Sequence, residues 1–299
     1  MTRLGPGLTI GFKTSPQGVD VAAIDALWRL AGELPVFDAG WFNDHLSDVR
    51  LERGGASLEA LTLAAGVAHH VPGKWIGMAV LSNTFRHPAV LAKQATVLDQ
   101  LTGGRFILGL GAGWHEGEHE AFGIPLPPPP ERFDRLESSL RVLSALFSDA
   151  ARRPPGVELD DPFVPLRGAT NEPAPLRPGG PLIWLGGQRR RGIELAVRYA
   201  SGWPMPGDRA GDIAYFTAKR DQIRRALEAA GRDPDDFSFA AQVAVGDSLT
   251  ARRETLESAI AFVRAGADHL ILAVNAQLGP DRLRDAAREV AEPLRDRFA

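Results

Sequence analysis

Residues 104–123 read GRFILGLGAGWHEGEHEAFG, and this stretch decides which fold and which chemistry the chain can have. It begins with a short apolar run, 106–110, that is typical of a buried strand. Glycines then alternate at Gly109, Gly111 and Gly113. Small residues at a strand end let another group approach the backbone closely. The stretch therefore predicts either tight packing at a barrel corner or a cofactor edge that lies on bare backbone.

The same stretch contains HEGEH at 115–119, which matches the His-Glu-x-x-His signature of zinc proteases. A zinc site needs two histidines one helical turn apart and a third ligand. In the extended motif, Phe122 stands where glycine is required, and Pro125 stands where the third histidine is required. Gly117 would lie inside the helix, at a cost of about 1 kcal/mol relative to alanine. We therefore expect no metal site here.

The composition excludes several classes of protein. The chain has 299 residues, of which 44% are hydrophobic and 24% charged, which suits an α/β protein with a sizeable core. A net charge of −3 offers no basic field for nucleic acid or anionic lipid. The absence of cysteine excludes disulfides, thiol nucleophiles and thiolate metal sites. We find no signal-peptide pattern and no membrane-length apolar run, so we expect a cytoplasmic protein.

Short apolar runs alternate with helical patterns eight times along the chain. Eight strand–helix units predict a TIM (β/α)8 barrel, whose active site lies at the carboxyl ends of the strands. A doubly wound sheet is the alternative, but eight units in about 290 residues favour closure. We expect one domain, 1–299, with strands at 8–12, 40–43, 75–81, 106–110, 182–185, 202–205, 239–245 and 269–274, and helices at 20–34, 57–70, 87–101, 131–147, 190–200, 210–230, 250–265 and 280–297.

The connection between the fourth and fifth strands is about twice as long as such a unit needs. It holds 13 of the chain's 23 prolines. We interpret 124–181 as an insertion and its polar part, 149–181, as a lid over the barrel mouth, because long loops on this face usually carry function. The alternative is a surface excursion without function.

Four stretches of the chain resemble the bacterial luciferase-like superfamily, which includes flavin-dependent monooxygenases and deazaflavin-dependent relatives. They are GWFNDHL (40–46), AVLSNTFRHPAVLAKQATVLDQLTGGRFILGLGAGW (79–114), PLIWLGGQ (181–188) and ASGW (200–203). The resemblance implies a TIM barrel that binds FMN or the 8-hydroxy-5-deazaflavin coenzyme at the carboxyl ends of its strands. The second stretch looks closest to the deazaflavin-dependent branch.

The resemblance places the phosphate of the cofactor at the turn Gly186-Gly187-Gln188. Backbone N–H groups at a helix start suit a phosphate, and the arginines at 189–191 either add positive charge or form a solvated loop. The turn of Ala112 and Gly113 would line the cofactor.

The resemblance also implies that the third strand supports the ring of the cofactor. In the deazaflavin-dependent members a cis peptide bond supports the back face of the ring, and the matching bond is Ala79–Val80. Ser82 and Asn83 follow it and could hydrogen-bond the ring or the ribityl chain.

Asp44 and His45 end the second strand. The resemblance implies that Asp44 touches the cofactor and that His45 acts in proton transfer, which suits a group that titrates near neutrality. The alternative for His45 is a structural histidine. The related sugar-phosphate dehydrogenases carry a glutamate acid where this chain has Trp114, and His115 or Glu118 could replace it. This departure argues against sugar-phosphate activity and favours another, apolar organic substrate.

The leading hypothesis is a deazaflavin-dependent oxidoreductase that transfers hydride to or from a small organic substrate. The alternatives are an FMN-dependent monooxygenase fed by a partner reductase and a non-catalytic flavin-binding barrel. An aldolase or isomerase is disfavoured, because Lys13 is the only lysine at the carboxyl end of a predicted strand. The resemblance also implies a homodimer. We expect substrate specificity in 149–181 and after the first, seventh and eighth strands.

Overall fold

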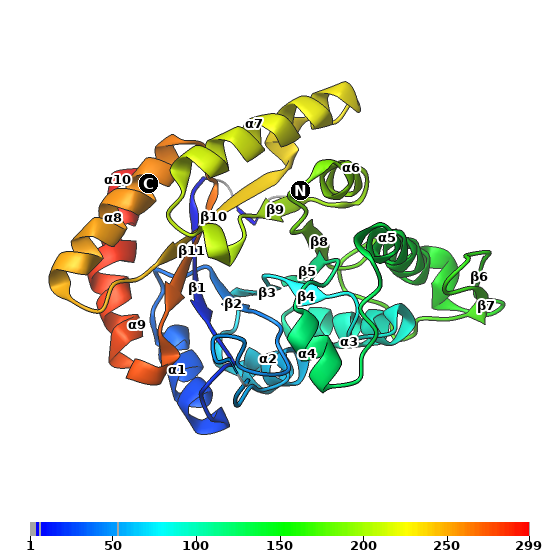
Figure 1. Cartoon of the computed structure of the whole chain (residues 1–299), viewed down its shortest axis with the longest axis horizontal. Helices are drawn as coiled ribbons and strands as arrows, with labels where there is room; N and C mark the ends of the chain where they lie inside the picture. The colour runs from blue at the N-terminus through cyan, green and yellow to red at the C-terminus, as the bar shows by residue number, and fades with distance from the viewer. Residues whose placement is uncertain (1–3, 6, 53, 299) are drawn as a thin grey trace.

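Eight parallel strands close into a barrel in the computed structural model, which describes residues 4–5, 7–52 and 54–298 (Figure 1). The pairing runs from β1 through β2, β3, β5, β8, β9, β10 and β11 and returns to β1. The predicted TIM barrel is therefore confirmed. The strands are β1 (Thr9–Thr14), β2 (Ala39–Phe42), β3 (Trp75–Met78), β4 (Leu81–Ser82), β5 (Phe106–Gly111), β8 (Leu182–Leu185), β9 (Gly202–Pro204), β10 (Ser238–Ala244) and β11 (His269–Val274).

Helices cover the outside of the barrel (Figure 1). They are α1 (Val21–Glu33), α2 (Ala60–Val67), α3 (Pro88–Leu101), α4 (Glu116–Ala121), α5 (Pro129–Leu146), α6 (Arg190–Tyr199), α7 (Ile213–Ala229), α8 (Leu249–Arg264), α9 (Asp281–Ala286) and α10 (Glu292–Phe298). The predicted helix at 57–70 begins only at Ala60, because the Glu59 side chain caps it. The predicted helix at 280–297 is divided by a π turn, Ala287–Ala291. No helix in the described part of the chain is long and apolar enough to cross a membrane.

The third predicted strand is interrupted. β3 ends at Met78 and β4 resumes at Leu81, and the Ala79–Val80 peptide bond between them is cis. The cis bond that the resemblance implied at this position is confirmed.

Two tryptophans fill the half of the barrel that lies toward the amino ends of the strands. Trp41 and Trp184 are fully buried, and their ring centroids lie 5.1 Å apart. A Cβ atom on Gly11 or Gly77 would overlap the Trp41 ring, and one on Gly202 would overlap Trp184. This half of the barrel is therefore a packed core, and a ligand has room only at the carboxyl ends of the strands, which we call the barrel mouth.

The next inward-facing layer lies two residues further along each strand and forms the floor of the mouth. This floor has a small side on the third, fourth and fifth barrel strands and a polar side on the first, second and seventh. The small side holds Ala79, Gly109 and Gly186, and the polar side holds Lys13, Asn43 and Gln242. Pro204 of β9 and Ala273 of β11 complete the layer. A flat ring fits against the small side, while the polar side can hold a polar group.

Residues 149–181 lie along the outside of α3 and α5, and their hairpin, β6 (Val157–Leu159) with β7 (Leu166–Ala169), stands at the edge of the molecule (Figure 1). The Asn171 amide donates to the Thr96 hydroxyl of α3 at 3.0 Å. Because α5 runs from the mouth to the far end of the barrel, the segment after it starts at that far end. The predicted lid is therefore not seen in 149–181. The connection 112–128, with α4, stands at the mouth instead.

Candidate active site

The HEGEH motif forms the start of α4, which it fastens to the neighbouring strand ends. The His115 side chain caps the helix and accepts a hydrogen bond from the Glu118 N–H at 3.0 Å. His119 pairs through Nε2 with the Thr84 hydroxyl at 2.6 Å and through Nδ1 with the His115 carbonyl at 2.7 Å. Among the described residues, no group of three or more His, Cys, Asp or Glu side chains could hold a metal ion.

Glu118, the inner glutamate of that motif, holds His45. The Oε2 atom of Glu118 lies 3.1 Å from Nδ1 of His45, and Oε1 accepts hydrogen bonds from the N–H groups of Leu46 and Ser47. The Glu118 side chain is only 1% exposed. Burial alone would raise the pKa of Glu118, but the His45 hydrogen bond and these N–H groups lower it below its ordinary value. Glu118 is thus an anion that orients the imidazole.

Trp114 stands beside this pair at the mouth. Its side chain is large and apolar, yet the residue is 65% exposed. Its ring meets the rings of His45 and His115 edge to face, with centroids 6.0 and 5.0 Å away. An exposed aromatic surface next to a candidate proton-transfer group suits contact with an organic ligand. Of the two candidates for the acid that Trp114 displaces, the structure brings Glu118 to His45.

Asp44 is engaged inside the protein. Its side chain is 1% exposed and forms two hydrogen bonds with Arg86, at 2.7 and 2.8 Å. It also accepts from the Ser82 N–H at 2.9 Å, while Arg86 makes a second ion pair with Glu59. Burial opposes the charge of Arg86, but the two carboxylates raise its pKa. Asp44 thus ties β2 to β4, and its predicted contact with a cofactor would require this pair to open.

The other predicted residues of β4 and β5 lie together. The Asn83 N–H donates to the Gly111 carbonyl at 2.9 Å, which joins the two strand ends. Gly113 has a φ of 87°, and a Cβ atom there would lie 2.8 Å from the Thr84 hydroxyl and 3.0 Å from that of Ser82. Ala112 is partly buried in the same turn. The structure therefore gathers Ser82, Asn83, Ala112 and Gly113 at one edge of the mouth.

Val80 occupies the small side of the floor. A Cβ atom on Gly111 or Gly186 would lie 2.9 or 3.3 Å from a Val80 methyl group, and one on Gly109 would overlap the Met78 carbonyl oxygen. The glycines therefore make room for the chain at Met78 to Val80. For Gly109, this supports tight packing at a barrel corner, the first of the two interpretations of the glycine alternation. Val80 itself offers an apolar platform between β5 and β8.

The turn Gly186-Gly187-Gln188 connects β8 to the first N–H groups of α6. The Gly187 carbonyl accepts from the Trp203 indole at 3.1 Å, and the Gln188 amide oxygen accepts from the Tyr215 hydroxyl at 2.9 Å. These bonds fix the turn, while the helix start presents donors and a positive dipole end to an anion.

The three arginines after this turn differ in their partners. Arg190 pairs with Glu194 at 2.9 Å, and Arg191 pairs with Asp134 at 2.7 Å. Arg189 occupies the N-cap position of α6 without a side-chain capping bond, and it has no carboxylate partner among the described residues. Of the three, Arg189 is therefore the one whose charge is free to act on an anion at the helix start.

The two glycines of the turn should respond differently to substitution. A Cβ atom on Gly187 would lie 2.5 Å from the Gly192 backbone, so a side chain there would overlap the first turn of α6. We expect Gly187→Ala to lower the free energy of unfolding by about 1–3 kcal/mol through overpacking.

Gly186→Ala is the matched control. Its Cβ would meet only Val80 methyl groups on the inward face, so we expect near-normal stability and weaker cofactor binding. Urea unfolding and cofactor titration of both variants check this pair of results, and equal stability losses would contradict it.

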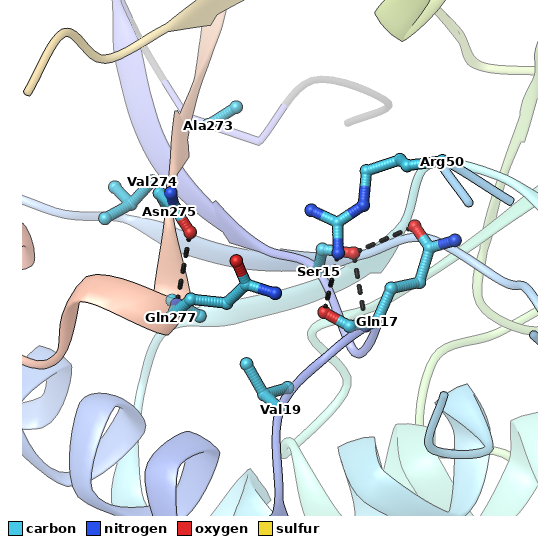
Figure 2. A pocket seen from close by; sticks show the side chains of 9 residues that line it. Ser15, Gln17, Val19, Arg50, Ala273, Val274, Asn275 and Gln277 are labelled. Carbon is cyan, nitrogen blue, oxygen red and sulfur yellow. Dashed lines mark hydrogen bonds between the residues drawn. The ribbon is translucent and has the colours of Figure 1, made fainter. Parts of the chain in front are cut away.

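A cavity of about 180 Å³ opens at the carboxyl ends of β1 and β11. Figure 2 shows the side chains of Ser15, Gln17 and Arg50 on one side of it and those of Asn275 and Gln277 on the other. This cavity lies where we expected substrate specificity, after the first and eighth strands.

The residues at the mouth fit a flavin-type cofactor. The Asn43 side-chain oxygen is buried in the floor layer, and no described residue hydrogen-bonds it. Gly186 presents bare backbone to the mouth, and a Cβ atom there would already lie 3.3 Å from a Val80 methyl group. A ligand with a polar ring edge and a phosphate would donate a hydrogen bond from the ring edge to the Asn43 oxygen. Its phosphate would lie at the start of α6.

The fold and this site define a TIM barrel whose candidate site lies at the carboxyl ends of its strands. A family model described as luciferase-like monooxygenase matches residues 11–297, so the chain belongs to the luciferase-like monooxygenase family. The family that the sequence motifs indicated is thereby confirmed.

Two curated relatives and one solved structure illustrate the similarity. A phthiodiolone/phenolphthiodiolone dimycocerosates ketoreductase of Mycobacterium tuberculosis is 30% identical over 214 residues, covering 70% of this chain and 54% of that protein. An F420-dependent glucose-6-phosphate dehydrogenase of Kineococcus radiotolerans is 30% identical over 230 residues, covering 76% and 65%. The chain thus spans between about half and two thirds of these relatives. A long-chain alkane monooxygenase structure shares the fold, with a TM-score of 0.78, 18% identity and coverage of 98% and 92%.

Proposed function

We propose that this chain is a deazaflavin-dependent oxidoreductase that transfers hydride between the coenzyme and a small organic carbonyl or alcohol. The observation that carries the proposal is the position of His45. A buried Glu118 anion holds this side chain at the barrel mouth, whose floor has a small side lined by glycine. The F420-dependent relative supports the choice of coenzyme, and the ketoreductase relative supports the reaction class. When bound, the coenzyme supplies the hydride.

The chain's own residues would bind the cofactor and move the proton. Gly186, Gly187 and Gln188 would hold the phosphate, Ala79 and Val80 would support the ring, and Ser82, Asn83, Ala112 and Gly113 would contact its edge. His45 would give a proton to the substrate oxygen as hydride reaches the carbon, and would take it back in the reverse direction. Trp114 would exclude water from this step.

An FMN-dependent monooxygenase is the second candidate. The observation that favours it is Trp114, which replaces the acid of the related dehydrogenases with an apolar surface. That reaction would need a partner reductase to supply reduced flavin. A non-catalytic flavin-binding barrel is disfavoured, since it would not require an oriented His45–Glu118 pair. The reductase, the homodimer and the cytoplasmic location stay predictions.

Fluorescence-quenching titrations of the cofactor-free protein with F420, the 8-hydroxy-5-deazaflavin coenzyme, and with FMN test the proposal. We expect F420 to bind at least about tenfold more tightly, a difference of about 1.4 kcal/mol. Gly186→Ala should weaken the binding of whichever cofactor is used. Tighter binding of FMN would favour the monooxygenase, and binding of neither would refute both cofactor-dependent functions.

A further inference from the structure

Lys13 is a partly buried cation that the proposed reaction does not use. It follows Gly11 on the inward face of β1, and its ammonium donates to the Gln242 amide oxygen at 2.9 Å. No carboxylate pairs with it among the described residues. Gln242 is itself held by the Met205 carbonyl. A partly buried ammonium with only an amide partner lacks a counter-charge, and a ligand can supply one.

The cavity of Figure 2 opens beside the backbone of Lys13, which is not itself one of the lining residues. Lys13 pairs in register with Ala273, which lines the cavity, and Ser15 lines it two residues further along β1. The lining contains hydroxyl, amide and guanidinium groups but no carboxylate. Arg50, the charged residue of the lining, is already neutralised by Asp48 at 2.7 Å. Lys13 is therefore the uncompensated charge at this side of the mouth.

We propose that the polar side of the floor, next to this cavity, binds an anionic oxygen group of the substrate, a carboxylate, with the Lys13 ammonium as its counter-charge. The inference names a substrate class for the proposed function and rests on it: an organic acid whose carboxylate lies on the polar side of the floor, while its reacting carbon faces the small side. Neutral substrates would leave the ammonium uncompensated.

Burial lowers the pKa of Lys13 to about 8, and the groups that face it do not oppose this. They are the uncharged Gln242 amide and Gly207 after β9. His269 lies nearer the amino ends of the strands than the floor. It is neutral at pH 7, because burial lowers its pKa to about 3. The ammonium therefore carries its charge at neutral pH and loses it as the pH rises through about 8.

Calorimetric titration with benzoate and with benzamide, its neutral isostere, tests the proposal on the cofactor-free protein. At pH 7 we expect benzoate to bind at least about tenfold more tightly than benzamide. This preference should disappear in Lys13→Met and should shrink in the unaltered protein at pH 9.5. Lys219→Met is the matched control, because the ammonium of Lys219, on α7, also donates to an amide, that of Gln222, in an exposed hydrogen bond.

Equal binding of the two probes by the unaltered protein, or a preference that survives in Lys13→Met, would overturn the proposal. A preference lost in Arg50→Met but kept in Lys13→Met would assign the counter-charge to Arg50 and would also overturn it. Because no cofactor is present, a protein that prefers benzoate but binds neither F420 nor FMN would retain this inference and lose the proposed function.

The stability of Lys13→Met is a second measurement. The folded-state pKa of Lys13 lies below its unfolded value, so its burial costs stability below pH 8, and this cost vanishes as the pH rises toward 10.5. We expect the variant to melt roughly 2–6 °C higher at pH 7. A lower melting temperature would show that Lys13 is a structural residue and would count against the proposal.

Discussion

His45→Ala should lower the turnover rate by roughly 10²–10⁴-fold while leaving cofactor affinity nearly unchanged. The imidazole is partly exposed at the mouth, and Glu118 holds its Nδ1 atom, so its interaction with the reacting oxygen is felt mainly in the transition state. The measurement pairs a cofactor titration with single-turnover oxidation of the reduced coenzyme by a ketone acceptor. Added imidazole should restore part of the rate by occupying the space that the ring leaves.

Glu118→Gln tests whether Glu118 acts through His45. We expect a smaller loss of rate and a changed pH profile of turnover, because the amide cannot supply the anion that orients the ring. A structural role alone would lower stability without changing that profile.

His70→Ala is the matched control, since the side chain of His70 also pairs with a carboxylate, that of Asp25 at 2.6 Å, but follows α2 on the outside of the barrel. Its rate should be normal. If the rate and cofactor affinity of His45→Ala fell in proportion, the proton would have to come from another group.

Asp44→Ala should lower the free energy of unfolding by about 3–5 kcal/mol, the cost of breaking a buried ion pair by removing one partner. Arg86 would keep only Glu59, which is more exposed than Asp44, and the Ser82 N–H would lose its acceptor. Urea unfolding with an unchanged m-value measures the loss. Removing both charges, in Asp44→Ala with Arg86→Met, should cost less than the single change.

Asp149→Ala provides the comparison for an exposed pair. Asp149 contacts Arg152 at 3.0 Å, but its side chain is 90% exposed, so we expect a change of about 0–1 kcal/mol. Should Asp44→Ala instead keep its stability and lose cofactor affinity more than about tenfold, Asp44 would contact the cofactor directly, as the family resemblance implied.

Local patterns were sufficient to predict the architecture. Strand-length apolar runs and amphipathic helical stretches report burial directly, since each face of a strand or helix must match its surroundings. Two predicted strands, at 182–185 and 269–274, agree with β8 and β11 to the residue. The alternating glycines at the end of the 106–110 strand indicated the barrel mouth. Small residues at a strand end allow another part of the chain, or a ligand, to approach the backbone closely.

What the sequence could not determine were the partners that long-range folding creates. Arg86 looked like an ordinary residue near a helix start, yet it neutralises Asp44, 42 positions away. Glu118 belonged to an apparent zinc motif, yet it orients His45 from 73 positions away. The lid was placed at 149–181 from proline content, although that segment begins at the far end of the barrel.

Sequence alone determined the barrel and the family and indicated the strand ends of the candidate site, because these depend on the periodicity and identity of neighbouring residues. Only the tertiary structure decided which charges meet: Asp44 with Arg86, His45 with Glu118, and Lys13 with no acid among the described residues. The physical reason is that closing the barrel brings together side chains from strands far apart in the chain. Burial there makes each unpaired charge costly, so pairing and burial together set what each group can do.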